Sequence, residues 1–247
     1  MFNVTWKKHA VAKSAPSAVR IGDYVYVGGG YAKRSSTHNV QRYSISKDEW
    51  TLLPDCPTIQ YGLASLNKEL MVIGGHLHGV ATNTVYTFRD GSWKHILPPM
   101  PTPRYLLSTT SHEDKIIIAA GGTTYITPNG EFLKTDDVEI YQLGKWYMTK
   151  RLPFPLGSSS ITIMDSTCYI FGDFSKSSYL KSTVFSTLSS LIENAEPEDP
   201  RYSTVHPVKW DTFPCQHPLL GTAILEVSGL PYSALFSRLA RKFVFAK

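Results

Sequence analysis

Two stretches of this 247-residue sequence decide the fold: residues 69–75 read ELMVIGG and residues 115–122 read KIIIAAGG. Each is an apolar run that ends in two glycines. A similar run ends at Gly28 and Gly29, and a fourth ends at Gly172, which an aspartate follows. The first glycines of these runs are 46, 47 and 51 residues apart along the chain. A recurring distance of about 50 residues predicts a structural repeat.

A tryptophan completes each unit. After every glycine run comes a second strand-like segment, then Trp50, Trp93, Trp146 or Trp210, and then a proline-rich turn. The apolar runs are continuous, which is typical of strands that are buried on both faces. Paired glycines suit a crowded strand end where backbones approach closely. The tryptophans are large enough to fill the space between twisted sheets. We therefore expect the glycines and the tryptophans to be structural.

The order of these features resembles the kelch repeat, in which each unit is a four-stranded antiparallel blade of a β-propeller. The resemblance covers almost the whole chain and implies an all-β fold. The repeat residues on which it rests are Gly28, Gly29, Gly74, Gly75, Gly121, Gly122, Gly172, Trp6, Trp50, Trp93, Trp146 and Trp210.

We expect one propeller domain over residues 1–247, with blades at 15–57, 58–101, 102–155, 156–215 and 216–247. The fourth blade carries an insertion at 186–205, in which residues 186–195 are predicted to form a short helix. The fifth blade is degenerate, because it lacks a glycine pair. Residues 1–14, which include Trp6, are predicted to close the ring by pairing with residues 242–246. Two alternatives stay open: a truncated six-bladed ring, and a basic amphipathic helix over residues 232–247.

Composition argues against several classes of protein. The formal net charge is +5, and the basic residues are scattered, so no nucleic acid partner is expected. The apolar runs are strand-sized, so no membrane contact is expected. Cys56, Cys168 and Cys215 are an odd number without close spacing, which disfavours a disulfide framework or a zinc site. We expect a monomer in the cytoplasm.

The sequence shows no catalytic signature and predicts neither a cofactor nor a metal. It contains no nucleophile elbow, phosphate-binding loop or metalloprotease helix motif. His76 and His78 are the nearest approach to a metal pair, but two imidazoles without a visible third ligand make a weak site. Kelch-like propellers include copper-radical oxidases and sugar isomerases, so an enzyme is the second interpretation. A degenerate, non-functional fragment is the third.

The resemblance favours a non-catalytic module that binds a protein or peptide. In such propellers the loop after the glycine pair and the turn into the next blade open on one face. Tyrosine, arginine and histidine are good interface anchors, since they combine apolar area with a polar tip. The expected partner-binding residues are Tyr31, Arg34, Tyr61, His76, His78, Arg104, Tyr105 and Tyr125. The resemblance also implies two settings for such a module: substrate recognition in a ubiquitin ligase, or association with actin.

Overall fold

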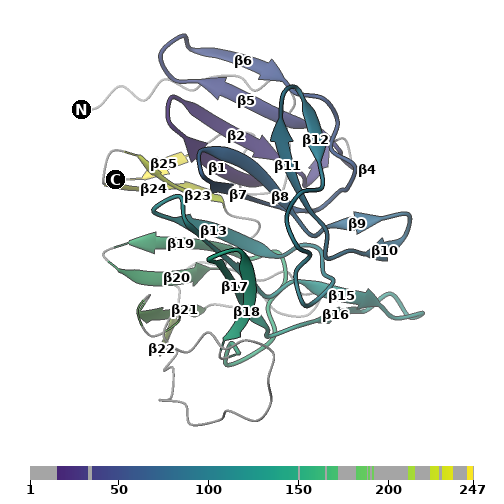
Figure 1. Ribbon diagram of the computed structural model, residues 1–247. Coiled ribbons are helices and arrows are strands. Elements are labelled where there is room, and N and C mark those ends of the chain that lie inside the picture. The colour runs from purple at the N-terminus through teal and green to yellow at the C-terminus, as the bar shows by residue number, and fades with distance from the viewer. Residues whose placement is uncertain are drawn as a thin grey trace.

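The structure of the protein is a computed structural model, shown in Figure 1. It describes residues 16–32, 35–149, 151–164, 166–171, 182–187, 189, 191, 211–214, 223–227, 230–235 and 244–246. Trp6, Arg34, Gly172, Trp210 and Cys215 lie outside the described residues.

Four antiparallel sheets of four strands follow one another along the chain. The first contains β1 (Ser17–Ile21), β2 (Tyr24–Gly28), β5 (Val40–Ser44) and β6 (Glu49–Leu52), in that spatial order. The second contains β7 (Gly62–Leu66), β8 (Glu69–Ile73), β11 (Val85–Arg89) and β12 (Ser92–Lys94). The third contains β13 (Ser108–His112), β14 (Ile116–Ala120), β17 (Val138–Gln142) and β18 (Lys145–Thr149). The fourth contains β19 (Ser160–Met164), β20 (Thr167–Phe171), β21 (Ser182–Thr187) and β22 (Asp211–Pro214).

A fifth sheet has three described strands, which are β23 (Ala223–Val227), β24 (Leu230–Leu235) and β25 (Val244–Ala246). The helix alternative for the C-terminus is therefore wrong at residues 232–235 and 244–246. Within the predicted helix 186–195, residues 186 and 187 belong instead to β21, while Ser189 and Leu191 are helical. The remainder of that segment and the predicted closing strand at residues 1–14 lie outside the described residues. Ring closure through residues 1–14 thus stays a prediction.

The first strand of each sheet lines the centre of the ring. β1 contacts β7, β7 contacts β13, and β13 contacts β19. β23 contacts both β19 and β1, which leaves no place for a sixth sheet between these strands. The described strands thus close a ring of five sheets, an antiparallel β-propeller (Figure 1).

The second and third sheets pack against neighbours on both of their faces, and the second strand of the third sheet shows this most clearly. In β14, Ile117 and Ala119 face the second sheet, whereas Ile118 and Ala120 face the fourth. Successive side chains of a strand point to opposite faces. A strand with two buried faces therefore needs apolar residues at every position, which explains the continuous run.

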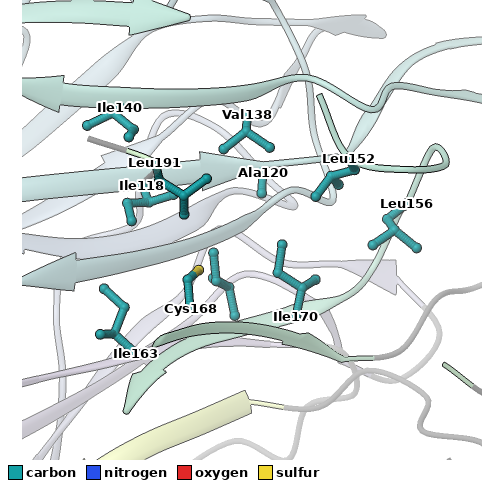
Figure 2. Packing of buried hydrophobic residues seen from close by; sticks show 11 residues of the cluster. Ile118, Ala120, Val138, Ile140, Leu152, Leu156, Ile163, Cys168, Ile170 and Leu191 are labelled. Atoms are coloured by element: carbon teal, nitrogen blue, oxygen red, sulfur yellow. The ribbon is translucent and has the colours of Figure 1, made fainter. Parts of the chain in front are cut away.

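Figure 2 shows the core between the third and fourth sheets. Ile118 and Ile140 come from β14 and β17, and Ile163 and Ile170 come from β19 and β20. All four are at most 8% exposed. Leu191, from the segment after β21, is also fully buried in this cluster. The insertion of the fourth blade thus contributes to the core.

The tryptophans join the outer strands to the preceding blade. Their rings pack across the strand pair on an aromatic partner at centroid distances of 4.9 to 5.3 Å, in the pairs Tyr43 and Trp50, Phe88 and Trp93, and Tyr141 and Trp146. Trp93 Nε1 donates to the carbonyl of Pro54 at 2.9 Å, and Trp146 Nε1 donates to that of Pro98 at 3.0 Å. The prolines after each sheet therefore receive a hydrogen bond from the next sheet.

The glycine pair of the first blade lies one residue further along than the sequence suggested. Gly28 ends β2 opposite Val40, just as Ala120 ends β14 opposite Val138. Gly28 is thus the counterpart of Ala120, and its missing side chain leaves room for the Tyr61 ring. The pairs that correspond to one another, all with φ between 60° and 109°, are Gly29 and Gly30, Gly74 and Gly75, and Gly121 and Gly122.

These glycines are required by backbone conformation and by lack of space. Gly121 has φ +60°, and a Cβ there would lie 2.6 Å from the carbonyl oxygen of Leu156 in the next blade. At Gly74 a Cβ would lie 2.5 Å from the carbonyl oxygen of Arg104. In these two pairs the second glycine bonds to the same segments, since Gly75 N donates to Arg104 O and Gly122 N to Leu156 O.

Gly121→Ala should destabilise the fold more than Gly144→Ala does. Gly144 also has a positive φ (+85°), but a Cβ there meets nothing within 4 Å. Both variants incur the left-handed backbone cost of about 1–2 kcal/mol. Only Gly121→Ala adds a clash with backbone, which costs about 1–3 kcal/mol more. Urea denaturation of the two variants measures the difference. Equal midpoints would show that the close approach of Gly121 to the Leu156 carbonyl does not exclude a side chain at position 121.

Candidate functional site

The propeller has two different faces. On one, which we call the turn face, tight turns join the first strand to the second and the third to the fourth in each of the first three sheets. On the other, the loop face, the chain leaves the second strand of each of these sheets through the glycine pair and forms a short hairpin. The loop-face hairpins are β3 (Tyr31–Ala32) with β4 (Ser35–Ser36), β9 (His76–Leu77) with β10 (Val80–Ala81), and β15 (Thr123–Ile126) with β16 (Phe132–Lys134).

Backbone hydrogen bonds tie the loop-face entrances of three blades together. Leu106 N donates to Gln60 O at 2.8 Å, and Ser158 N donates to Leu106 O at 2.9 Å. All three residues have a positive φ between 52° and 56°. Gln60, Leu106 and Ser158 therefore occupy equivalent positions at the start of their blades.

Arg104 is not an exposed anchor, contrary to the sequence-based expectation. Its side chain is 0% exposed and forms a 2.9 Å ion pair with Glu139, which is also fully buried. It also donates to the carbonyls of Asp137 and Ala119 at 3.1 and 3.2 Å. Burial lowers the pKa of Arg104 and raises that of Glu139, while each charge opposes the shift of the other. Arg104 thus holds β14 and β17 together.

Tyr61 and Tyr105 are also buried, so their predicted exposure is wrong. The Tyr61 ring covers Gly28 and Gly29, and its hydroxyl donates to Asn39 O at 3.1 Å. Tyr105 packs on the ring of His76 at 5.1 Å between centroids. Burial raises the pKa of Tyr61 well above its usual value and that of Tyr105 to about 12. Tyr61 thus joins the first and second blades through its hydroxyl, whereas Tyr105 contacts the β9–β10 hairpin through its ring.

The remaining described candidates do reach the surface. His78 is exposed at the tip of its hairpin, and Tyr125 is 56% exposed on β15. Tyr31 and His76 are half-buried, and the Tyr31 hydroxyl accepts a 2.5 Å hydrogen bond from Gln60 Nε2. The structure thus places Tyr31, His76, His78 and Tyr125 on the loop-face hairpins.

Exposed apolar side chains gather on two of these hairpins, which the sequence analysis did not single out. Val80 on β10 is 67% exposed, Leu133 on β16 is 56% exposed, and Ile126 on β15 is also exposed. Strands β10 and β15 contact each other, and Figure 1 shows both hairpins projecting from the same side of the ring. We call Val80, Tyr125 and Leu133 the hairpin patch. Ile126 follows Tyr125 on β15, so its side chain points to the opposite face of that hairpin. An available signal was the apolar residues following Gly79 and Gly130 in loops otherwise rich in polar residues.

The described residues contain no cluster of side chains that could bind a metal ion. Among them, no three His, Cys, Asp or Glu side chains are grouped closely enough to hold a metal ion. Cys56 and Cys168 are free and buried, and burial raises the pKa of each thiol to about 12. No helix within the described ranges has the length and apolar character needed to span a bilayer.

Comparison with known proteins agrees with this architecture. The Kelch motif model matches residues 12–57, which include the first sheet. Kelch-like protein 23 of Homo sapiens is 27% identical over 147 residues, which are 58% of this chain and 25% of that protein. Kelch-like protein 40 of Xenopus tropicalis is 36% identical over 92 residues, 36% of this chain and 14% of that protein. Beta-scruin of Limulus polyphemus is 24% identical over 167 residues, 62% of this chain and 18% of that protein.

A solved structure shows the same fold. The structure of YjhT superposes with a TM-score of 0.68 and 13% sequence identity, covering 93% of this chain and 73% of that chain. The four-stranded antiparallel sheets form a β-propeller, and its glycine pairs and packed tryptophans are those of the repeat. Together with the matches above, they identify the chain as a kelch-repeat propeller. The chain spans about a quarter of the length of Kelch-like protein 23.

Replacing Arg104 with Met should destabilise the protein strongly, by about 3–5 kcal/mol, because Glu139 would keep a buried charge without a partner. The double variant Arg104→Met, Glu139→Gln should recover part of this loss, because the buried charge is removed. Thermal and urea unfolding measure both effects.

Arg89→Met is the matched control. Arg89 pairs with Glu69 at 2.5 Å, but this pair lies at the surface, where solvent screens it. The unfolding midpoint of this variant should barely move. If Arg104→Met were equally mild, the buried ion pair would not support the third blade.

Proposed function

We propose that the protein is a non-catalytic interaction module that binds a protein or peptide partner through its loop face. The observation that carries this proposal is the hairpin patch. Its three side chains are among the eight exposed large apolar residues in the described part of the chain, and they lie on two neighbouring hairpins. Single exposed apolar residues are ordinary, whereas a cluster of them typically marks an interaction site.

The composition of the patch suits a protein interface. Tyr125 supplies a large ring with a polar tip, and Val80 and Leu133 add apolar area beside it. Aromatic anchors of this kind contribute much of the binding energy in protein interfaces. The hairpins are held in place at their bases, because Thr123 pairs with Tyr105 and His76 pairs with Ile59 through backbone hydrogen bonds on the loop face. Ordered hairpins lose little conformational freedom on binding.

Polar candidates from the sequence complete this proposed surface. His78 is exposed beside Val80, and Tyr31 lies on the hairpin of the first blade. Arg34, which lies outside the described residues, is proposed as a further contact from its place in the sequence. Arg104, Tyr61 and Tyr105 are left out because they are buried.

The relatives support an interaction role in place of catalysis. Those reported above are Kelch-like proteins and a scruin. Within this function we propose substrate recognition in a ubiquitin ligase or association with actin, in the cytoplasm.

The double variant Tyr125→Ser, Leu133→Ser should lose partner capture by about 100-fold or more, since two anchors at about 2 kcal/mol each would be removed. Its melting temperature should stay close to that of the parent protein, because both side chains are exposed. Proteins captured from cell extract by parent and variant are compared, and each protein lost is purified and titrated directly.

Leu143→Ser is the control, since Leu143 is 91% exposed in the turn between β17 and β18, on the turn face. It should capture the same partners as the parent protein. A partner that binds the double variant normally but not the control would place the binding surface on the turn face and overturn the proposal.

A further inference from the structure

The β15–β16 hairpin, which carries Tyr125 and Leu133 of the hairpin patch, turns back on itself at residues 127–131. Asn129 is exposed at this tip, which projects from the ring (Figure 1). Gly130 follows it with a φ of +77°, a conformation that glycine adopts at no steric cost. The tip thus exposes an asparagine followed by glycine, a dipeptide that occurs once in the 247-residue sequence.

Asparagine is a chemically labile residue, and one followed by glycine can react with its own backbone. The amide nitrogen of the glycine attacks Cγ of the asparagine, the new N–Cγ bond closes a succinimide ring, and the Cγ–Nδ2 bond breaks. Nδ2 leaves as ammonia and takes the proton that the glycine nitrogen loses. Glycine favours this step because it has no side chain to shield the nitrogen and leaves the backbone free to rotate.

Water then opens the succinimide ring at either of its carbonyl carbons. The hydroxyl group of the water adds to that carbon, the bond between the carbon and the ring nitrogen breaks, and the proton goes to the nitrogen. Attack at the former Cγ gives aspartate in an ordinary main chain. Attack at the backbone carbonyl carbon gives isoaspartate, whose main chain runs through Cβ and is longer by a methylene. Either product replaces a neutral amide with a carboxylate.

The structure separates Asn129 from the other described asparagines. Asn39 and Asn83 each donate a hydrogen bond through Nδ2, at 2.9 and 2.8 Å, and each precedes a β-branched residue. Asn67 is exposed in the β7–β8 turn, but it precedes a lysine. The side chain of Asn129 makes no hydrogen bond to any described residue, so none has to break before its Cγ is attacked.

Hydrogen bonds within the tip control how readily the reaction starts. Thr127 N donates to Glu131 O and Gly130 N donates to Thr127 O, both at 2.8 Å, and Glu131 N donates to Thr127 Oγ1 at 3.0 Å. The bond from Gly130 N must open before this nitrogen can attack Asn129. Such openings cost least at exposed loops and turns. We therefore expect the reaction to be slower than in a free peptide but still directed to Asn129.

The same turn sets the pairing of two hairpin-patch residues. Tyr125 lies directly opposite Leu133 across the two strands. The length of a hairpin turn fixes the register of its strands. A longer main chain at position 129 would disturb the bonds between Thr127 and Glu131, and the new carboxylate would lie close in sequence to the carboxylate of Glu131. Both effects loosen the turn.

We propose that Asn129 is a site of spontaneous deamidation, and that its conversion to isoaspartate opens the β15–β16 turn and weakens partner binding by the hairpin patch. The part that concerns partner binding rests on the proposed function. The reaction needs water and no enzyme, so it advances with the age of each molecule. The chain thereby carries a slow chemical change that removes its loop-face binding site.

Ageing of the whole purified chain in mildly alkaline buffer tests the chemistry. Peptide mass spectrometry follows the change from amide to carboxylate at each asparagine, and enzymatic methylation of isoaspartate separates the two products. Asn129 should convert at least about ten-fold faster than Asn67, a difference of about 1.4 kcal/mol in activation free energy. Asn129→Gln keeps the amide on a longer side chain, so this variant should gain no carboxylate at position 129.

Hydrogen exchange and partner capture test the consequences. In the isoaspartate form the amides of Thr127 and Glu131 should exchange at least about ten-fold faster than in the fresh chain, while those of β14 stay protected. Asn129→Gln aged in the same buffer is the matched control and should exchange as the fresh chain does. The isoaspartate form should also capture partners at least about ten-fold more weakly than this aged control.

The proposal is overturned if Asn129 converts no faster than Asn67, or if the isoaspartate form exchanges as slowly as the fresh chain. If the turn opens as expected but partner capture is unchanged, the binding consequence and the proposed hairpin-patch surface both fail, while the modification site stands. The chemical and the functional readouts therefore separate failure of this proposal from failure of the proposed function.

Discussion

The constraint on which the rest of the structure depends is that a blade within the ring packs on both of its faces, as the second and third blades do. Because side chains alternate along a strand, a second strand such as β14 serves two interfaces at once: Ile117 and Ala119 pack toward one neighbour, and Ile118 and Ala120 toward the other. No position on such a strand is free to be polar and face solvent. Function is therefore displaced to the two faces of the ring, where strands end and turns begin.

The same packing constrains the loop face more than its loops suggest. The glycine pairs let the backbone of one blade approach the entry segment of the next within hydrogen-bond distance, as Gly75 does at Arg104 O and Gly122 at Leu156 O. Large side chains on those entry segments, such as Arg104 and Tyr61, are then covered by the neighbouring blade and become buried. Arg104 and Tyr61 turn inward and join strands, whereas the hairpins beyond the glycines project from the ring and carry the exposed side chains. Residue types that make good interface anchors are here divided between the core and the surface.

Much of the fold could be predicted because its determinants repeat. Three glycine pairs at nearly constant spacing, with an aromatic residue and a tryptophan after each, indicate that one structural unit is repeated along the chain. The register error at Gly28 shows where this approach fails, since three consecutive glycines contain two possible pairs and only the strand pairing with Val40 distinguishes them. For the site, His78 and Tyr125 were placed on the surface from loop position alone. The burial of Arg104, Tyr61 and Tyr105 was not predicted, because it depends on which segment of a neighbouring blade covers each side chain.

The sequence by itself determined the repeat, the all-β class and the structural roles of the tryptophans, since these follow from local composition and periodic spacing. Only the tertiary structure decided which residues face a partner and which face the core. Val80 and Leu133 lie more than 50 residues apart in the chain, yet two hairpins of adjacent blades bring them to one surface. Arg20 and Asp114, which come from different blades, line one cavity because the ring brings the first strands of those blades together. Contacts between blades arise from closure of the ring, and no short stretch of sequence records which residues that closure will bring together.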